Sequence, residues 1–183
     1  NGPYEVEEGS TMTLVGDGFD PDGDPLTYFW DFDGDDIFET AGKETDFSAY
    51  SLDGPDEFLI SLKVCDDKDE CAVDESTIEI TNLPPTIIQC EIPEVPTNIN
   101  SGIPYYIEFS DPGLYDTFEI FIDWGDNSTT LIETSENLIE GIHTYNKAGI
   151  YDIDMTISDD DGGVATCGTK TVFITDPNAG FIT

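Results

Sequence analysis

The stretches ISLKVCDD at Ile60–Asp67 and IDMTISDD at Ile153–Asp160 decide the fold of this chain. Each alternates apolar with polar residues and then ends in paired aspartates, which is the pattern of a half-buried β-strand followed by a turn. Upstream of each stretch lies a second pair of similar segments, FDPDGDPLTYFWD at Phe19–Asp31 and SDPGLYDTFEIFID at Ser110–Asp123. The chain therefore contains one kind of module twice.

The remaining apolar segments are also short, for example Thr11–Val15 and Ser76–Thr81, and turn-forming Asp, Gly, Asn and Pro residues separate them. No segment sustains the 3.6-residue periodicity of a helix, so the pattern predicts an all-β fold of two tandem immunoglobulin-like sandwiches. The junction NLPPT at Asn82–Thr86 carries two prolines, which exclude a helix and stiffen the linker. We expect one sandwich over residues 1–83 and a second over residues 84–183.

The charge of the chain is strongly negative, with 41 acidic residues against five lysines and a net charge of −36. Such a surface repels nucleic acids and anionic lipids, and no apolar run approaches the ~18 residues of a membrane span. The same surface attracts cations, which favours calcium binding; the alternative is a solvated acidic surface suited to salty surroundings. The sequence begins abruptly at Asn1 without a signal peptide, so we expect a segment of a longer protein.

The segment DFDGDDIFE places carboxylates at alternate positions of a predicted turn, with Gly34 to permit a positive φ. Calcium takes six to eight oxygen ligands, chiefly from carboxylates and carbonyls. Asp31, Asp33, Asp35 and Glu39 are therefore candidate ligands of Ca²⁺. The alternative is a hairpin turn that binds no ion, because Asp and Gly are common turn residues.

Four cysteines are present, and no CxxC pair accompanies the single histidine to indicate zinc. Two disulfides in an oxidising compartment are the better interpretation. Cys65 and Cys71 flank DDKDE, which is typical of a hairpin tip, so we predict that they are bonded to each other.

The motifs in this order resemble those of the PKD (polycystic kidney disease) domain. The first module has NGPY from Asn1, DPDG from Asp20 and YFWDFDGD from Tyr28. The second has IDWGDN from Ile122, HTY from His143 and then SDDDG at 158–162. The first copy lacks the His-x-Tyr pair and the second lacks the Asn-Gly-Pro-Tyr opening, so the loops are expected to differ between the modules.

This resemblance implies an immunoglobulin-like sandwich of the kind found in archaeal surface-layer proteins, cell-surface receptors and secreted enzymes that degrade polysaccharides or collagen. In these proteins the modules act as spacers or adhesive units, and some bind calcium. The resemblance also implies a calcium site at the end of the first module that holds the second-to-third-strand turn, with ligands from Asn1, Asp20, Asp22, Asp24 and Asp66. In the second module Asp111 and Asp159 remain, but Gly113 stands where Asp22 stands in the first, so we expect a weaker site or none there.

The resemblance further pairs Cys90, in the first strand of the second module, with Cys167, expected in its last strand. It makes His143 a structural residue. Trp30 is expected in the core, while Trp30 and Trp124 as sugar-stacking platforms are the alternative. Asn127 begins an N-glycosylation sequon, NST, in a predicted exposed turn.

These observations predict a calcium-binding structural or adhesive module of an extracellular or cell-surface protein, without enzymatic activity. Its partners are expected to be other extracellular proteins, a polysaccharide or further copies of itself. Two alternatives are a carbohydrate-binding accessory module of a secreted hydrolase and a subunit segment of an extracellular filament or surface layer.

Overall fold

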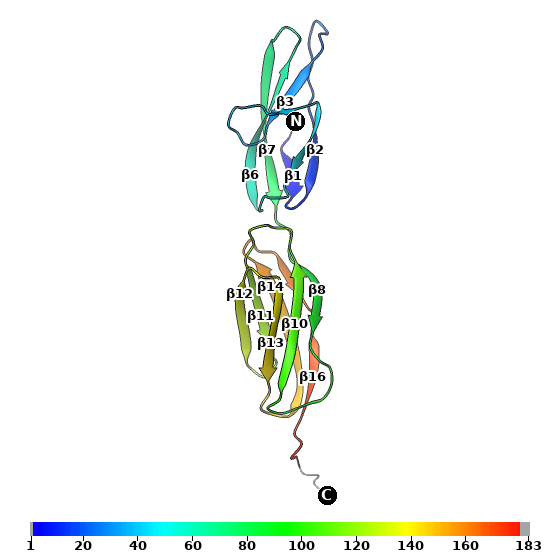
Figure 1. The fold of residues 1–183 in the computed structure, drawn as a ribbon, viewed down its shortest axis with the longest axis vertical. Helices are drawn as coiled ribbons and strands as arrows, with labels where there is room; N and C mark the ends of the chain where they lie inside the picture. Colours follow the sequence, from blue (N-terminus) through cyan, green and yellow to red (C-terminus); the bar gives the residue numbers. More distant parts are fainter. Residues whose placement is uncertain (1, 180–183) are drawn as a thin grey trace. The chain divides into compact units, whose positions relative to one another are not determined.

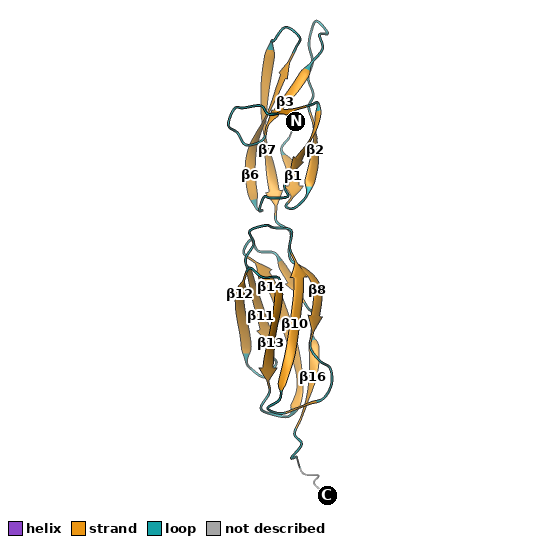
Figure 2. Cartoon of the chain, viewed as in Figure 1, coloured by secondary structure: helices purple, strands orange, loops and turns teal. Residues whose placement is uncertain are grey.

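The computed structural model describes residues 2–179 and contains strands but no helix over that range (Figure 2). The described residues accordingly include no helix that is long and apolar enough to cross a membrane. The chain divides into two compact units. The first holds the residues up to Leu83 together with Pro112–Tyr115, and the second holds Pro84–Asp111 and the residues from Asp116 onward.

The described residues of the first unit form seven strands. They are β1 (Tyr4–Glu7), β2 (Thr11–Val15), β3 (Thr27–Asp31), β4 (Thr40–Ala41), β5 (Glu44–Ser48), β6 (Asp56–Cys65) and β7 (Cys71–Thr81). Figure 1 labels the long strands β6 and β7 of this unit. A five-stranded sheet has the order β1-β7-β6-β3-β4, and β2 and β5 form a separate two-stranded sheet. Strand β1 runs parallel to β7, whereas β6 pairs with β7 as a long antiparallel hairpin.

The core of the first unit is formed by inward-facing residues at alternate strand positions. Leu14, Phe47, Ile60 and Ile78 belong to this core. Trp30 is also buried there, as predicted, and its indole N–H donates a hydrogen bond of 2.9 Å to the Gly42 carbonyl. Alternation along strands such as β5 therefore separates a buried face from an exposed, partly acidic one.

Nine strands build the second unit. They are β8 (Thr86–Glu91), β9 (Thr97–Asn98), β10 (Gly102–Ser110), β11 (Phe118–Asp123), β12 (Thr129–Thr134), β13 (Leu138–Thr144), β14 (Gly149–Asp159), β15 (Val164–Thr166) and β16 (Lys170–Thr175). One sheet has the order β13-β10-β8, and the other has the order β12-β11-β14-β16-β9 with β15 paired to β14. The fold is therefore all-β with two immunoglobulin-like sandwiches, as the sequence predicts.

Aromatic residues dominate one region of the second core. The Trp124 and His143 rings stack at 4.2 Å with an interplanar angle of 3°, and Tyr145 meets His143 edge-on. The buried Tyr145 hydroxyl donates a hydrogen bond of 2.9 Å to the Trp124 carbonyl. Trp124 is buried, so the interpretation of the two tryptophans as sugar-stacking platforms is wrong for both.

Candidate functional site

The loop between β3 and β4 is organised around the carboxylate of Asp31. Asp31 is the last residue of β3 and is buried. Its Oδ1 accepts hydrogen bonds from the backbone N–H groups of Asp33 (3.1 Å) and Gly34 (2.8 Å), and its Oδ2 accepts one from Asp36 (2.9 Å). Gly34 and Asp36 have positive φ angles of 70° and 66°, which turn these N–H groups inward.

Burial alone raises the pKa of the Asp31 carboxyl, but the N–H donors of Gly34, Asp36 and Asp33 outweigh it, so its pKa lies below the usual value. One carboxylate oxygen each from Asp31, Asp33 and Asp35 lies within 4.8 Å of the others. Glu39, also predicted as a ligand, is exposed just before β4 and is not part of this group. The bend of the loop ends at Asp36 and Glu39 lies beyond it, so a spacing count along the sequence did not place its side chain.

A second group in the first unit brings together Asp20, Asp24 and Asp66, again with carboxylate oxygens within 4.8 Å. Asp20 Oδ1 accepts the backbone N–H groups of Asp24 (3.0 Å) and Asp22 (2.8 Å), and these bonds lower the pKa of Asp20, the Asp24 bond most. Asp22 contributes its backbone, while its side chain is exposed outside the group. Asn1, the remaining predicted ligand, lies outside the described residues.

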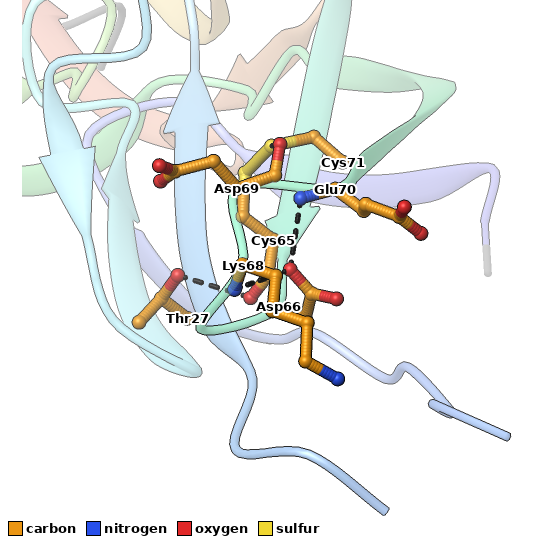
Figure 3. Close-up of a disulfide and its surroundings, with 7 residues drawn as sticks. All are labelled: Thr27, Cys65, Asp66, Lys68, Asp69, Glu70 and Cys71. Atoms are coloured by element: carbon orange, nitrogen blue, oxygen red, sulfur yellow. Dashed lines mark hydrogen bonds between the residues drawn. A yellow bond between two sulfur atoms is a disulfide. The ribbon is translucent and has the colours of Figure 1, made fainter. Parts of the chain in front are cut away.

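The β6–β7 hairpin carries Asp66 into this group, and a disulfide closes its tip (Figure 3). Cys65 and Cys71 are directly paired across the hairpin with a Cα–Cα distance of 4.1 Å. Within the loop, Asp66 Oδ1 accepts the backbone N–H groups of Lys68 and Glu70, each at 2.8 Å. The Lys68 Nζ lies 2.5 Å from Asp24 Oδ2, so a lysine already offsets part of the local negative charge.

The second unit contains an acidic group in which Asp116, which the sequence analysis did not identify, joins Asp111 and Asp159. Carboxylate oxygens of Asp111, Asp116 and Asp159 lie within 4.8 Å of one another, and Asp116 and Asp159 are buried. Asp159 Oδ1 also accepts the backbone N–H groups of Asp161 (3.0 Å) and Gly163 (2.6 Å). The expectation of a weaker site or none rested on Gly113, but Asp116 supplies a carboxylate from the same β10–β11 connection.

A signal for Asp116 was present in the sequence. The residue lies in the β10–β11 connection, which corresponds to the β2–β3 connection that carries Asp20 and Asp24 in the first unit. Asp160 lies beside the same group, and its Oδ1 accepts the backbone N–H of Thr117 at 2.8 Å. This hydrogen bond lowers the pKa of Asp160. Comparing whole connections, rather than single aligned positions, would have identified Asp116.

A second disulfide joins Cys90 of β8 to Cys167, with 77 residues of separation. The two bonds thus join the same partners that the sequence analysis paired. The sequence analysis expected Cys167 in the last strand, but the residue lies in the connection between β15 and β16. Since β8 belongs to one sheet and β15 pairs within the other, this bond links the two sheets of the sandwich.

Asn127 lies in the β11–β12 turn, and His143 of β13 contacts the same turn. His143 Nε2 lies 3.2 Å from Asp126 Oδ2, and Asp126 also accepts the hydroxyl and backbone N–H of Ser128. Burial raises the pKa of Asp126, but these partners outweigh it and leave the pKa lowered. Asn127 is exposed with a φ of 70°, so its side chain is accessible to modification.

Comparison with known proteins identifies one family, and its model lies within the second unit. The family model of the PKD domain matches residues 88–175. Among solved structures, the PKD domain of an M14-like peptidase from Thermoplasmatales archaeon SCGC AB-540-F20 is 26% identical, with 52% of this chain and 100% of that chain covered and a TM-score of 0.44. The PKD domain of the human VPS10 domain-containing receptor SorCS2 is 18% identical over 54% of this chain and 80% of that chain, with a TM-score of 0.42.

The protein SGBP-B of the mixed-linkage glucan utilization locus of Bacteroides ovatus, solved with a mixed-linkage heptasaccharide, is 17% identical. The alignment covers 93% of this chain and 42% of that chain, with a TM-score of 0.34. The family match identifies residues 88–175, within the second of the two sandwiches described above, as a PKD domain.

Proposed function

We propose that this chain is a structural and adhesive segment of an extracellular or cell-surface protein, and that calcium stiffens it. PKD modules are typical of extracellular proteins, and disulfides form and persist in oxidising compartments. The observation that carries the calcium proposal is the convergence of carboxylates from separate connections in both units, around Asp66 in the first and around the buried Asp116 and Asp159 in the second.

The ligand chemistry of these groups favours a hard cation. Every member of the groups within either unit is an aspartate. Ca²⁺ binds oxygens at about 2.3–2.6 Å, so oxygens on opposite sides of one ion lie about 5 Å apart, close to the separations present here. All four cysteines are engaged in disulfides, which leaves few of the soft ligands that zinc prefers.

Calcium would act by tying connections together. In the first unit, one ion would join the β2–β3 connection, through Asp20 and Asp24, to the β6–β7 hairpin through Asp66. In the second, it would join the β10–β11 connection, through Asp111 and Asp116, to the end of β14 at Asp159. Without a cation these carboxylates repel one another, and a divalent ion reverses the sign of that interaction.

Thermal unfolding of the whole chain tests this proposal. A ligand that binds only the folded state adds about 2.7 kcal/mol at a hundredfold excess over Kd, which corresponds to a rise in Tm of about 10–20 °C for a domain of this size. We expect millimolar CaCl₂ to raise the Tm well beyond NaCl of equal ionic strength, and a chelator to reverse the rise. Equal shifts from both salts would show screening of an acidic surface and contradict the site.

Matched variants assign the ions. Asp66→Asn combined with Asp33→Asn should remove the calcium-dependent part of the Tm in the first unit, and Asp159→Asn should do so in the second. The exposed residues Glu57 and Glu119 serve as controls, because Glu57→Gln and Glu119→Gln remove the same charge outside the groups. Calcium responses that survive both Asp variants, or that both controls reduce equally, would contradict the assignment.

The carbohydrate-binding alternative requires exposed aromatic platforms. Phe121 and Phe173 are exposed on the outer face of the larger sheet of the second unit. They lie opposite Thr156 and Ile150 of β14, and these are separated by roughly 20 Å at the rise of a strand. Two such distant single rings do not form a continuous platform, so the spacer and adhesive function is better supported.

A filament or surface-layer role remains an alternative, which the mass of the native assembly would test.

A further inference from the structure

A groove of about 790 Å³ lies against the three-stranded sheet of the second unit, away from the acidic groups described above. Its lining comes from β8, β10 and β13 and from the segment that follows β8. Much of this lining is apolar, and Ile142 on β13 is 73% exposed. The apolar lining residues include Ile92, Pro93, Pro104, Tyr105, Tyr106 and Ile142.

Carboxylates alternate with this apolar surface. Glu91 is directly paired with Tyr106, and Tyr106 is directly paired with Glu140, so the three form one row across β8, β10 and β13. The Tyr106 hydroxyl donates a hydrogen bond of 2.8 Å to Glu108, which raises the pKa of Tyr106 and fixes the ring. With Glu94 at the edge and Lys170 opposite, the groove lining contains three carboxylates and one lysine.

The backbone beside the groove is open on one side. Strand β8 ends at Glu91, opposite Tyr106, so among the described strands the part of β10 from Gly102 to Tyr105 pairs only with β13. The Phe109 N–H donates to the Asn137 carbonyl on the β13 side. Because backbone groups alternate in direction along an antiparallel strand, those of Pro104 point to the open side.

Proline at this position offers an acceptor without a donor. Its carbonyl can accept a hydrogen bond, but it has no N–H, and so an added strand cannot form a complete ladder here. An occupant of the groove is therefore expected to supply N–H donors, from its backbone or its side chains, together with apolar side chains.

We propose that this groove binds an extended, basic segment of another protein. Apolar side chains of that segment pack against Ile142 and Pro104, and its lysine or arginine side chains pair with Glu91, Glu94 and Glu140. A second copy of this chain is a poor occupant, since it carries a net charge of −36 with only five lysines. A glycan is less well matched, because the lining offers prolines, isoleucines and a half-buried tyrosine rather than exposed aromatic faces.

Backbone NMR of the whole chain tests the proposal with a synthetic peptide of about twelve residues in which lysine and valine alternate. We expect amide shifts to concentrate at Glu91, Ile92, Glu94, Tyr106 and the β13 segment 140–142. Glu140 and Ile142 are both exposed, and the double variant Glu140→Gln with Ile142→Ser should weaken peptide binding by about tenfold, through one lost ion pair and one lost apolar contact. Their matched control is Glu133→Gln with Leu131→Ser on β12, which should change Kd by less than about twofold.

Three results would overturn the proposal. The first is equal affinity for a lysine–serine peptide with shifts spread over the acidic surface, which would show non-specific attraction. The second is a neutral β-linked oligosaccharide that shifts the groove amides when the lysine–valine peptide does not, which would make the groove a glycan site. The third is no shift with the lysine–valine peptide at millimolar concentration. Repeating the titration with calcium and with chelator separates this proposal from the proposed metal sites. Peptide binding should be the same in both, since no residue of the acidic groups lines the groove.

Discussion

Asp31 shows how a single carboxylate can organise a loop before any ion is considered. Its two oxygens accept three backbone N–H groups of the following turn. Since the same side chain also lies against Asp33 and Asp35, it has both a structural and a candidate ligand role. The two roles are compatible, because a carboxylate offers about four lone-pair sites.

The structural role of Asp31 predicts a specific pH dependence. Asparagine at position 31 places an NH₂ group where Oδ2 accepts the Asp36 N–H, so Asp31→Asn should cost about 1–3 kcal/mol of unfolding free energy at neutral pH. The folded-state pKa of Asp31 is lowered, so its contribution is present above the unfolded value near 4 and is lost as the pH falls through the folded value. Denaturant unfolding in chelator should therefore show the difference between wild type and variant shrinking below about pH 4. A constant difference down to pH 3 would contradict this role, and the exposed Glu39→Gln is the control.

At the scale of elements, the two disulfides constrain very different lengths of chain. Cys65–Cys71 closes a sequence separation of six within one hairpin, whereas Cys90–Cys167 closes 77 residues and joins the two sheets of the second unit. Sheet faces also carry unfavourable rows of charge, since Glu5 and Glu57 both lie directly opposite Glu79. Strand pairing thus places like-charged side chains opposite one another, which destabilises the folded state. The two disulfides and bound or nearby cations offset this repulsion.

Loop length predicts the relative contribution of the two bonds. On chain-entropy scaling, replacing Cys90 and Cys167 together by serine should cost about 4–5 kcal/mol, and replacing Cys65 and Cys71 together should cost about 2 kcal/mol. Urea unfolding of the two double variants measures the difference, and peptide mapping without reduction confirms each pairing in the parent chain. A larger loss from the hairpin bond would show that native-state effects, rather than loop entropy, dominate.

At the scale of the whole molecule, each unit has its own core and its own disulfide, and the division at Leu83 and Pro84 follows the two-proline junction. The high negative charge is shared by both, so each depends on cations or salt to limit self-repulsion.

We predict that residues 1–83 and residues 84–183, expressed separately under oxidising conditions, each unfold in one cooperative thermal transition. The reason is that each piece retains its own continuous apolar core. Calorimetry of each piece, with calcium present, makes the measurement. Failure of both pieces to unfold cooperatively would contradict the two-module organisation.

The sequence by itself determined the all-β class, the internal repeat and the acidic turns, because period-two alternation and turn residues act over a few positions. It also indicated that Cys65 pairs with Cys71, since a hairpin brings these two residues together whatever surrounds it. Only the tertiary structure decided which carboxylates meet. Strand register and the path of each connection brought Asp116 to Asp159 and left Asp22 and Glu39 outside the groups. The burial of Trp124 against His143 and the open side of β10 at Pro104 likewise depend on contacts between distant strands, which no local pattern specifies.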